Sequence, residues 1–438
     1  MTEIFHALTA ELARVEVNLR VGRVTEVSGG VLQVTGLQTH ARMGDRVQIR
    51  SHAQTVGGEV LRLSPRAVVV LPDSGGEGLA IGDQVELHGS GGIAPHDDWI
   101  GRIIDAFGNP LDGKPLFSGP VRRPVRAAAP PATSRRRLGV RLGTSVAVFD
   151  TLLPIVRGQR IGLFAGSGVG KSSLLARFAR GVDADVIVIA LVGERGRELR
   201  EFTERTLGPA GMARSIIVAA TSDQSPLARR RCAWTAMAVA EHFRDQGLQV
   251  LLLVDSITRF AEAHREVALA AGEDAGMGGF PPSTSALIMG LAERAGPGPE
   301  GTGDITAVFS VLVAGSDMDG TVADILRGVL DGHVVMDRKI AERGRYPAID
   351  LLRSVSRSLP EAASDDENQM ILRARQLLGA YDRAELMIQA GLYAKGSDPM
   401  VDKAIEVWPV LDGFLAEMAP ASGIAGSFDR LRAILPKG

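Results

Sequence analysis

The chain contains 438 residues, of which 45% are hydrophobic and 23% charged, and its formal net charge is −2. These proportions exclude a disordered or fibrous chain and predict a globular protein of about three domains. The near-neutral charge and an aromatic content of 4% argue against a nucleic-acid partner. The single cysteine excludes an intramolecular disulfide and favours a cytosolic protein.

The first 18 residues have the pattern of an amphipathic helix. The apolar residues on its one face are Ile4, Phe5, Leu8, Leu12 and Val15. The stretch lacks the basic start and the long apolar core of a signal peptide, and no apolar run in the chain has the length of a membrane span. We expect residues 1–18 to form a helix that docks either on the chain's own first domain or on a partner protein.

Residues 19–92 predict a small β-barrel domain. Short β-branched runs are separated here by glycine-bearing turns such as Ser28-Gly29-Gly30. The expected strands lie near residues 23–27, 31–34, 47–49, 59–63 and 68–71. A barrel by itself indicates no particular chemistry.

Residues 93–358 predict a larger α/β domain. Its first part, up to residue 144, is rich in Gly, Pro and Arg, and we interpret it as a solvated linker that wraps the domain, although its arginines would also suit nucleic acid or acidic protein surfaces. Apolar runs of strand length then alternate with helical segments, which predicts a parallel sheet covered on both faces. The expected strands lie near residues 160–164, 185–192, 215–219, 250–254, 305–313 and 333–336.

Residues 359–438 predict a C-terminal helical domain, with long helices near residues 367–392 and 399–417.

A glycine-rich loop lies within RIGLFAGSGVGKSSLLARFARG, residues 160–181. The strand before it and the helix after it are the context of a phosphate-binding loop, in which backbone N–H groups and the helix dipole face phosphate oxygens. Lys171 would reach the β- and γ-phosphates and Ser172 would bind Mg²⁺, whereas the alternative is a plain glycine-rich turn. The expected nucleotide-binding residues of this loop are Ala165, which replaces the usual glycine, Gly166, Ser167, Gly168, Val169, Gly170, Lys171 and Ser172.

Acidic residues follow two further apolar runs, at the sheet edge where the phosphate loop is expected. Glu194 and Arg195 come just after the run near residues 185–192, and Glu194 suits the positioning or deprotonation of an attacking water. The alternative for Glu194 is a surface ion pair with a neighbouring arginine. Asp255 ends a buried run and suits the support of Mg²⁺ together with Ser172, a role compatible with capping the next helix. Arg259 is expected to brace this edge.

The stretch RYPAIDLLRSVSR, residues 345–357, supplies two more candidates. Tyr346 offers an aromatic face on which a purine can stack, and core packing is its alternative. Arg357 has no acidic neighbour in the stretch, so composition alone assigns it no role.

Four of these stretches, AGSGVGKS, VGERGRE, VLLLVDSITRFAEAHRE and PAIDLLRSVS, together resemble the α/β subunit family of rotary ATPases. Two longer ones, VAATSDQSPLARRRCAWTAMAVAEHFRDQG and SDMDGTVADILRGVLDGHVVMDRKIAERGRYPAIDLLRSVSR, are similar to the homohexameric ATPases of type III protein export. The resemblance covers nearly the whole chain, and it favours the flagellar branch over the injectisome branch. A Rho-like hexameric RNA translocase is disfavoured by the neutral charge, and a non-catalytic subunit by the presence of both carboxylates.

The resemblance implies a hexameric motor that hydrolyses ATP with Mg²⁺ and delivers and unfolds export substrates. It implies a cytoplasmic protein that is peripheral at the cytoplasmic face of the inner membrane. The partners it implies are copies of the same chain, a stator-like regulator at the N-terminal helix, a central coiled-coil stalk protein, export substrates with their chaperones, and an export gate in the inner membrane. Nucleic acid is not among them.

The resemblance also assigns roles to single residues. It makes Glu194 the catalytic carboxylate and Asp255 a support of the metal. It implies that Tyr346 stacks on adenine and that Arg357 reaches the nucleotide of the neighbouring subunit. In GMGGFPPSTSA, Phe280 replaces a more usual tyrosine in a loop that resembles the one facing a central pore.

Overall fold

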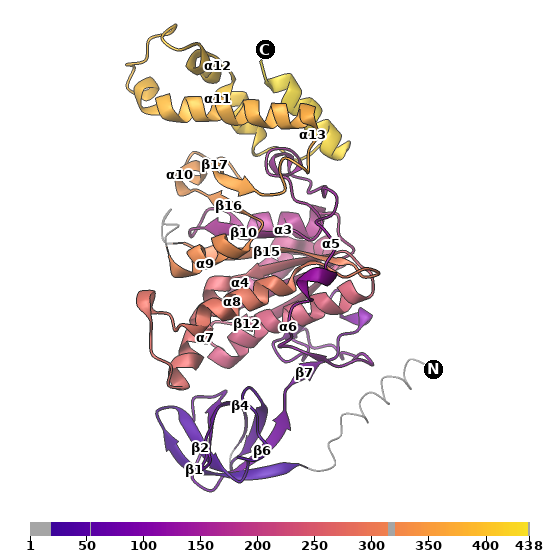
Figure 1. Ribbon diagram of the computed structural model, residues 1–438, viewed down its shortest axis with the longest axis vertical. Helices are drawn as coiled ribbons and strands as arrows, with labels where there is room; N and C mark the ends of the chain where they lie inside the picture. The colour runs from indigo at the N-terminus through magenta and orange to yellow at the C-terminus, as the bar shows by residue number, and fades with distance from the viewer. Residues whose placement is uncertain (1–18, 53, 314–319, 437–438) are drawn as a thin grey trace.

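The computed structural model describes residues 19–52, 54–313 and 320–436, so the helix expected at residues 1–18 lies outside the described residues. Three parts are stacked along the long axis of the molecule: a β-barrel, a central α/β part and a helical part (Figure 1). No helix among the described residues is long and apolar enough to cross a membrane.

The barrel is closed, with the strand order β1-β2-β5-β4-β3-β6. Its strands are β1 (Arg20–Ser28), β2 (Val31–Thr35), β3 (Arg46–Arg50), β4 (Thr55–Leu63), β5 (Val68–Pro72) and β6 (Gln84–Gly89). Alternate residues such as Leu32 and Val34 point inward and are fully buried, which is the pattern of a small barrel filled by side chains. The prediction of a barrel is confirmed, but β6 was not among the expected strands.

The central sheet has nine strands, in the order β17-β16-β10-β15-β13-β11-β12-β8, with β14 paired to β15. The strands of this path are parallel except for β17, and β14 is also antiparallel. The strands are β8 (Ile103–Asp105), β10 (Arg160–Ala165), β11 (Val186–Glu194), β12 (Ser215–Thr221), β13 (Val250–Asp255), β14 (Gly296–Pro297), β15 (Asp304–Leu312), β16 (Gly332–Met336) and β17 (Ile349–Ser356). The predicted parallel sheet is confirmed.

Helices cover both faces of this sheet. Helices α6 to α9 pack on one face, and α3 to α5 pack on the other (Figure 1). Their bounds are α2 (Ala147–Asp150), α3 (Lys171–Gly181), α4 (Gly196–Glu201), α5 (Gly208–Met212), α6 (Pro226–Asp245), α7 (Ile257–Ala270), α8 (Ser283–Arg294), α9 (Thr321–Val329) and α10 (Arg338–Glu342), with a π-helical turn at Phe202–Leu207. The strands are buried on both faces because each face carries its own apolar core, which is why their sequences are continuously apolar.

Part of the segment expected to be a solvated linker belongs to the folded domain. Strand β8 pairs with β12 at the edge of the sheet. The guanidinium of Arg136 donates to the carbonyl oxygens of Thr302 and Gly303 and lies 2.6 Å from an oxygen of Asp304. Arg135 lies 3.0 Å from a carboxylate oxygen of Glu293. These two arginines serve the chain's own packing, so they do not form the nucleic-acid surface considered above.

Three helices form the C-terminal part: α11 (Asp365–Gln389), α12 (Pro399–Phe414) and α13 (Gly423–Ile434). A capping box begins α11, in which the Ser364 hydroxyl accepts from the Glu367 amide and the Glu367 carboxylate accepts from the Ser364 amide. The predicted helical domain is confirmed, with α12 ending three residues earlier than expected.

Candidate active site

The phosphate-binding loop connects β10 to α3. Gly168 and Gly170 have φ angles of 78° and 86°, which is the left-handed region that glycine tolerates best. Ala165 is the last residue of β10, where it pairs with both β15 and β16 and is fully buried. The departure from the usual glycine therefore places a methyl group in the core of the sheet, before the loop begins.

The side chains of Lys171 and Asp255 meet beside this loop. Lys171 begins α3, Asp255 ends β13, and their side chains form an ion pair while being 11% and 5% exposed. The hydroxyl of Ser310, near the carboxyl end of β15, donates to the same carboxylate at 2.7 Å. Sequence reasoning missed Ser310, and its only signal was a small polar residue inside an apolar strand. The pairing keeps both charges in defined positions inside a partly buried site.

Glu194 ends β11 and is partly buried next to this pair. Burial, and then the negative charge of Asp255, raise its pKa to about 7, although the positive charge of Lys171 opposes the shift. Arg195 follows as the cap of α4, with a side chain that is 75% exposed and 3.1 Å from Glu198. The structure thus brings Lys171, Glu194 and Asp255 together and leaves Arg195 at the rim.

A cavity of about 650 Å³ is lined by the phosphate loop together with Glu194 and Arg195. Besides the loop, its walls include residues that the sequence analysis did not single out: Ser173, Gly193, Glu198, Ser222, Thr258, Glu262, Leu312 and Val313. Arg259 lines the same cavity, and its guanidinium lies 3.3 Å from a carboxylate oxygen of Glu262. Thr258 accepts a hydrogen bond from the Leu312 amide at 2.9 Å, which ties the start of α7 to the end of β15.

A smaller adjoining cavity of about 280 Å³ is lined by Ser172, Asp255 and Glu194, among others. A hydroxyl and carboxylates are the oxygen donors that suit Mg²⁺, which commonly keeps several waters and takes substrate phosphate oxygens as further ligands. Among the residues that the structure describes, no group of three or more His, Cys, Asp or Glu side chains is arranged to hold a metal by itself. The donor set therefore fits a Mg²⁺ ion that arrives with a nucleotide.

Tyr346 lies against the phosphate loop. A Cβ atom built on Gly170 would be only 3.0 Å from Cδ1 of the Tyr346 ring, so the ring and the loop are in close contact. Tyr346 is 46% exposed, so part of its ring remains accessible. This placement beside the loop suits contact with a nucleotide base.

Arg357 lies away from this cavity. It follows β17, where its amide donates to the carbonyl of Asp331, and the Asp331 amide donates to the carbonyl of Arg160. Arg160 is the first residue of β10, whereas the phosphate loop follows its last residue. Six residues of strand span about 17 Å, so Arg357 lies near the amino-terminal end of the parallel strands and the site lies at their carboxyl end.

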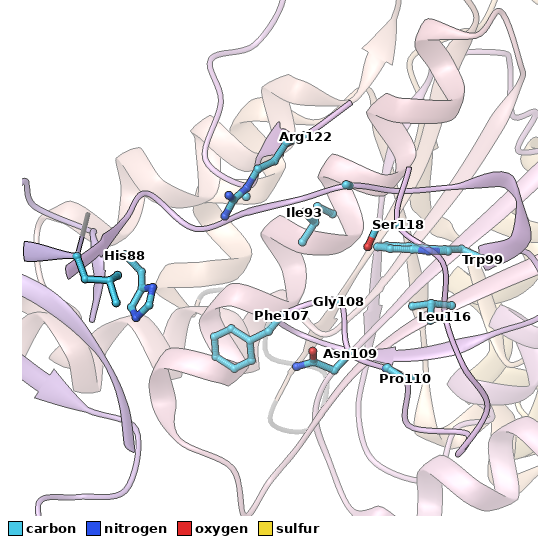
Figure 2. Close-up of a pocket in the computed structure, with 13 residues that line it drawn as sticks. His88, Ile93, Trp99, Phe107, Gly108, Asn109, Pro110, Leu116, Ser118 and Arg122 are labelled. Carbon is cyan, nitrogen blue, oxygen red and sulfur yellow. The ribbon is translucent and has the colours of Figure 1, made fainter. Parts of the chain in front are cut away.

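A separate cavity of about 610 Å³ lies where the barrel meets the α/β part (Figure 2). Figure 2 shows His88, Phe107, Asn109 and Arg122 around it. None of the described residues that line it is acidic. The described residues that line it include neither a carboxylate nor any part of the phosphate loop, so we do not assign hydrolysis to it.

Comparisons with known proteins agree with this geometry. Residues 145–356 match the nucleotide-binding domain of the ATP synthase alpha/beta family, and residues 363–432 match the C-terminal domain of the type III secretion ATPase EscN. The flagellum-specific ATP synthase of Caulobacter vibrioides is 43% identical, over 98% of this chain and 99% of its own length. That of Rhizobium meliloti is 46% identical, over 91% of this chain and 85% of its own. The type 3 secretion system ATPase of Xanthomonas euvesicatoria is 41% identical, over 94% and 92%.

Solved structures show the same fold. The assembled ATPase EscN of the enteropathogenic E. coli type III secretion system has a TM-score of 0.87 at 34% identity, covering 95% of this chain and 100% of EscN. EscN in complex with its central stalk EscO has a TM-score of 0.86 at 36% identity, with the same coverage. The resemblance noted from the motifs is confirmed. The chain is therefore an ATPase that belongs to the family of flagellum-specific ATP synthases and type III secretion ATPases.

Proposed function

We propose that copies of this chain form a homohexamer that hydrolyses Mg-ATP between subunits and so drives the export of flagellar proteins. The observation that carries the catalytic part is the convergence of Lys171, Glu194 and Asp255 beside a phosphate-binding loop. Lys171 and Asp255 form an ion pair there, and Glu194 lines two cavities, one together with Lys171 and the other together with Asp255. The flagellar assignment is supported by relatives of that name at up to 46% identity, against 41% for the type 3 secretion system ATPases.

The phosphate loop binds the triphosphate through its backbone amides. Without nucleotide, the ammonium of Lys171 is neutralised by Asp255. A bound triphosphate offers Lys171 a second set of negative oxygens, so the ammonium turns toward the β- and γ-phosphates. Ser172 and Asp255 hold Mg²⁺, which supplies charge neutralisation at the phosphates. Tyr346 stacks on the adenine, because its ring lies at the flank of the loop.

Glu194 orients the attacking water and accepts its proton. A carboxylate with a pKa of about 7 is a better proton acceptor near neutral pH than an ordinary glutamate. Arg195, exposed at the rim beside it, places a positive charge where the transferred phosphoryl group gains negative charge.

Arg357 acts on the nucleotide of the neighbouring subunit. It sits at the end of the sheet opposite to its own phosphate loop, so it contributes to a site only where two copies meet. An interface of this head-to-tail kind uses two different surfaces of the same chain and closes into a ring. An arginine delivered across such an interface stabilises the charge that develops during phosphoryl transfer.

Mixing two inactive variants tests this arrangement. Lys171→Ala destroys the site of its own chain and Arg357→Ala destroys that of the neighbour, so about a quarter of the interfaces in randomly mixed hexamers are intact. We expect hydrolysis to reappear on mixing and to be absent in either variant alone. The control is the double variant mixed with Lys171→Ala, which creates no intact interface. Absence of rescue in hexamers shown by native mass spectrometry to be mixed would refute sharing of the site.

The wider partners follow the same proposal. The complex of EscN with its central stalk EscO supports a coiled-coil stalk at the centre of the ring, and the N-terminal segment is the proposed contact of a stator-like regulator. Export substrates, their chaperones and the inner-membrane gate are the further partners of the proposed ring.

The loop that contains Phe280 is assigned to the contact with the stalk or with a substrate. Phe280 is partly buried, and the Arg265 guanidinium lies 5.5 Å from the centre of its ring. Unchanged export and unchanged stimulated hydrolysis in Phe280→Ala would remove that role.

A further inference from the structure

The loop that carries Tyr346 is shaped by the guanidinium of the preceding residue. Nη2 of Arg345 donates to the carbonyl of Ile349 at 2.8 Å, and Nη1 donates to the carbonyl of Pro347 at 3.4 Å. The side chain of Arg345 is only 8% exposed. Because the guanidinium bonds to carbonyls on the far side of Tyr346, the position of the ring depends on where the guanidinium is held.

The C-terminal helical part supplies the charge that holds it. Nε of Arg345 lies 3.1 Å from Oδ1 of Asp412, which belongs to α12. A guanidinium withdrawn from water needs an opposite charge nearby, since an uncompensated buried charge is costly. Asp412 supplies the larger of two compensating charges, and Asp350 supplies the smaller one.

The surrounding interface is well packed. The rings of Tyr381 on α11 and Trp408 on α12 are stacked with centroids 4.4 Å apart, and they line the same small cavity as Arg345 and Asp412. A second ion pair of this region joins Arg343 to Glu385 on α11 at 3.3 Å. Two ion pairs therefore link the segment before β17 to the helices, and Asp412 contacts the guanidinium that shapes the Tyr346 loop.

We propose that Asp412 is a positioning residue for recognition of the nucleotide base. Through Arg345 it holds the Tyr346 loop, and through that loop it holds the aromatic ring against Gly170. The inference rests on the proposed stacking of Tyr346 on adenine. It follows that binding of the base depends on how the helical part packs against the α/β part, whereas binding of the phosphates does not.

Asp412→Asn tests this dependence, because it removes the charge and keeps the shape. We expect the KM for ATP to rise about tenfold, within the range that loss of a base–aromatic stack produces, while kcat stays within twofold. The inhibition constant of Mg-tripolyphosphate, which has no base, is expected to stay unchanged. Glu385→Gln removes the neighbouring carboxylate of the same interface and is the matched control, for which both constants stay at wild-type values.

A second variant distinguishes the proposed positioning role from a folding defect. Arg345→Lys keeps a positive charge for Asp412 but loses the paired bonds to the loop, and the same ATP-specific rise in KM is expected. Combining Asp412→Asn with Tyr346→Ala should weaken ATP binding no further than Tyr346→Ala alone, because both act on one contact.

The outcomes separate this inference from the proposal on which it rests. If Tyr346→Ala raises the KM for ATP but Asp412→Asn and Arg345→Lys do not, stacking stands and the positioning role is wrong. If Tyr346→Ala itself leaves the KM unchanged, the stacking proposal is wrong and the inference falls with it. Equal weakening of ATP and tripolyphosphate by Asp412→Asn would show a general loosening of the site and would also overturn the inference.

Discussion

Replacing Glu194 with glutamine is expected to stop hydrolysis and, at the same time, to stabilise the nucleotide-free protein. Burial and Asp255 raise the pKa of Glu194 from 4.5 to about 7, so between these pH values the folded protein binds more protons at this site than the unfolded chain. Stability is therefore lost as pH rises from about 4.5 to about 7, and the full cost remains above pH 7. Glutamine cannot ionise and avoids this cost.

The magnitude follows from the size of the shift. A difference of about 2.5 pKa units corresponds to about 3 kcal/mol, which partial exposure of the carboxylate to solvent reduces to about 2 kcal/mol. We expect Glu194→Gln to be more stable than wild type by about this amount at pH 8 and by close to nothing at pH 4.5. Its kcat should fall by about 10² to 10⁴, which is the usual contribution of a positioned general base.

Two assays measure these effects. Urea unfolding of nucleotide-free protein at pH 4.5 and pH 8 gives the free energy of unfolding for wild type and Glu194→Gln. The pH dependence of kcat/KM reports the free enzyme, and a group with a pKa of about 7 predicts a fall of about fivefold from pH 7 to pH 6. A pH titration of the free nucleotide in the same buffers is the control, because the nucleotide's own phosphates also take up protons. If wild type and Glu194→Gln have equal free energies of unfolding at both pH values, and kcat/KM of the wild type stays constant down to pH 5.5, the assignment of this pKa to a catalytic Glu194 is refuted.

Three further predictions concern the loop, the core and assembly. Gly170→Ala should raise the KM for ATP and the inhibition constant of Mg-tripolyphosphate at least tenfold, because the added methyl meets Tyr346 at 3.0 Å in a backbone conformation with φ of 86°. Gly328→Ala, whose added methyl meets nothing within 4 Å, should change neither constant. Burial and then Arg230 lower the pKa of His264 to about 4, so the native state loses about 2 kcal/mol between pH 7.5 and pH 5, and His264→Gln should lose less by urea unfolding. Specific ATPase activity should rise with protein concentration, since the proposed site needs two copies, and a constant specific activity in dilute monomeric protein would contradict it.

The residues that lie together beside the phosphate loop could be predicted because their sequence signals are local. A run of buried strand residues ending in one polar group marks a strand end at the carboxyl edge of a parallel sheet, and Glu194 and Asp255 both have that pattern. The order of strands in the sheet was not needed for this prediction. Strands β13 and β10 are separated by β15, and Lys171 still reaches Asp255 across that strand.

Other features had a weak local signal or none. Strand β8 has three residues and is defined by its pairing with β12, more than a hundred residues away. Ser310 was passed over because its value depends on the neighbouring strand that carries Asp255. The pairing of Arg345 with Asp412 joins two domains, and neither sequence neighbourhood reveals the other. In each case the informative quantity is a distance between segments that are remote in the sequence.

The role proposed for Arg357 links the function of the protein to its fold. A parallel sheet places its phosphate loop at one end of the strands, and an antiparallel edge strand such as β17 returns the chain to the other end. One subunit therefore carries the phosphate loop at one end of the sheet and Arg357 at the other, where its guanidinium donates to the carbonyl of Arg327 at 3.2 Å. Under the proposed arrangement, closing a ring brings the two ends together at every interface, so hydrolysis at one interface is sensitive to the orientation of two subunits. That sensitivity is what a motor requires, because a rotation of one subunit then changes the chemistry at its neighbour.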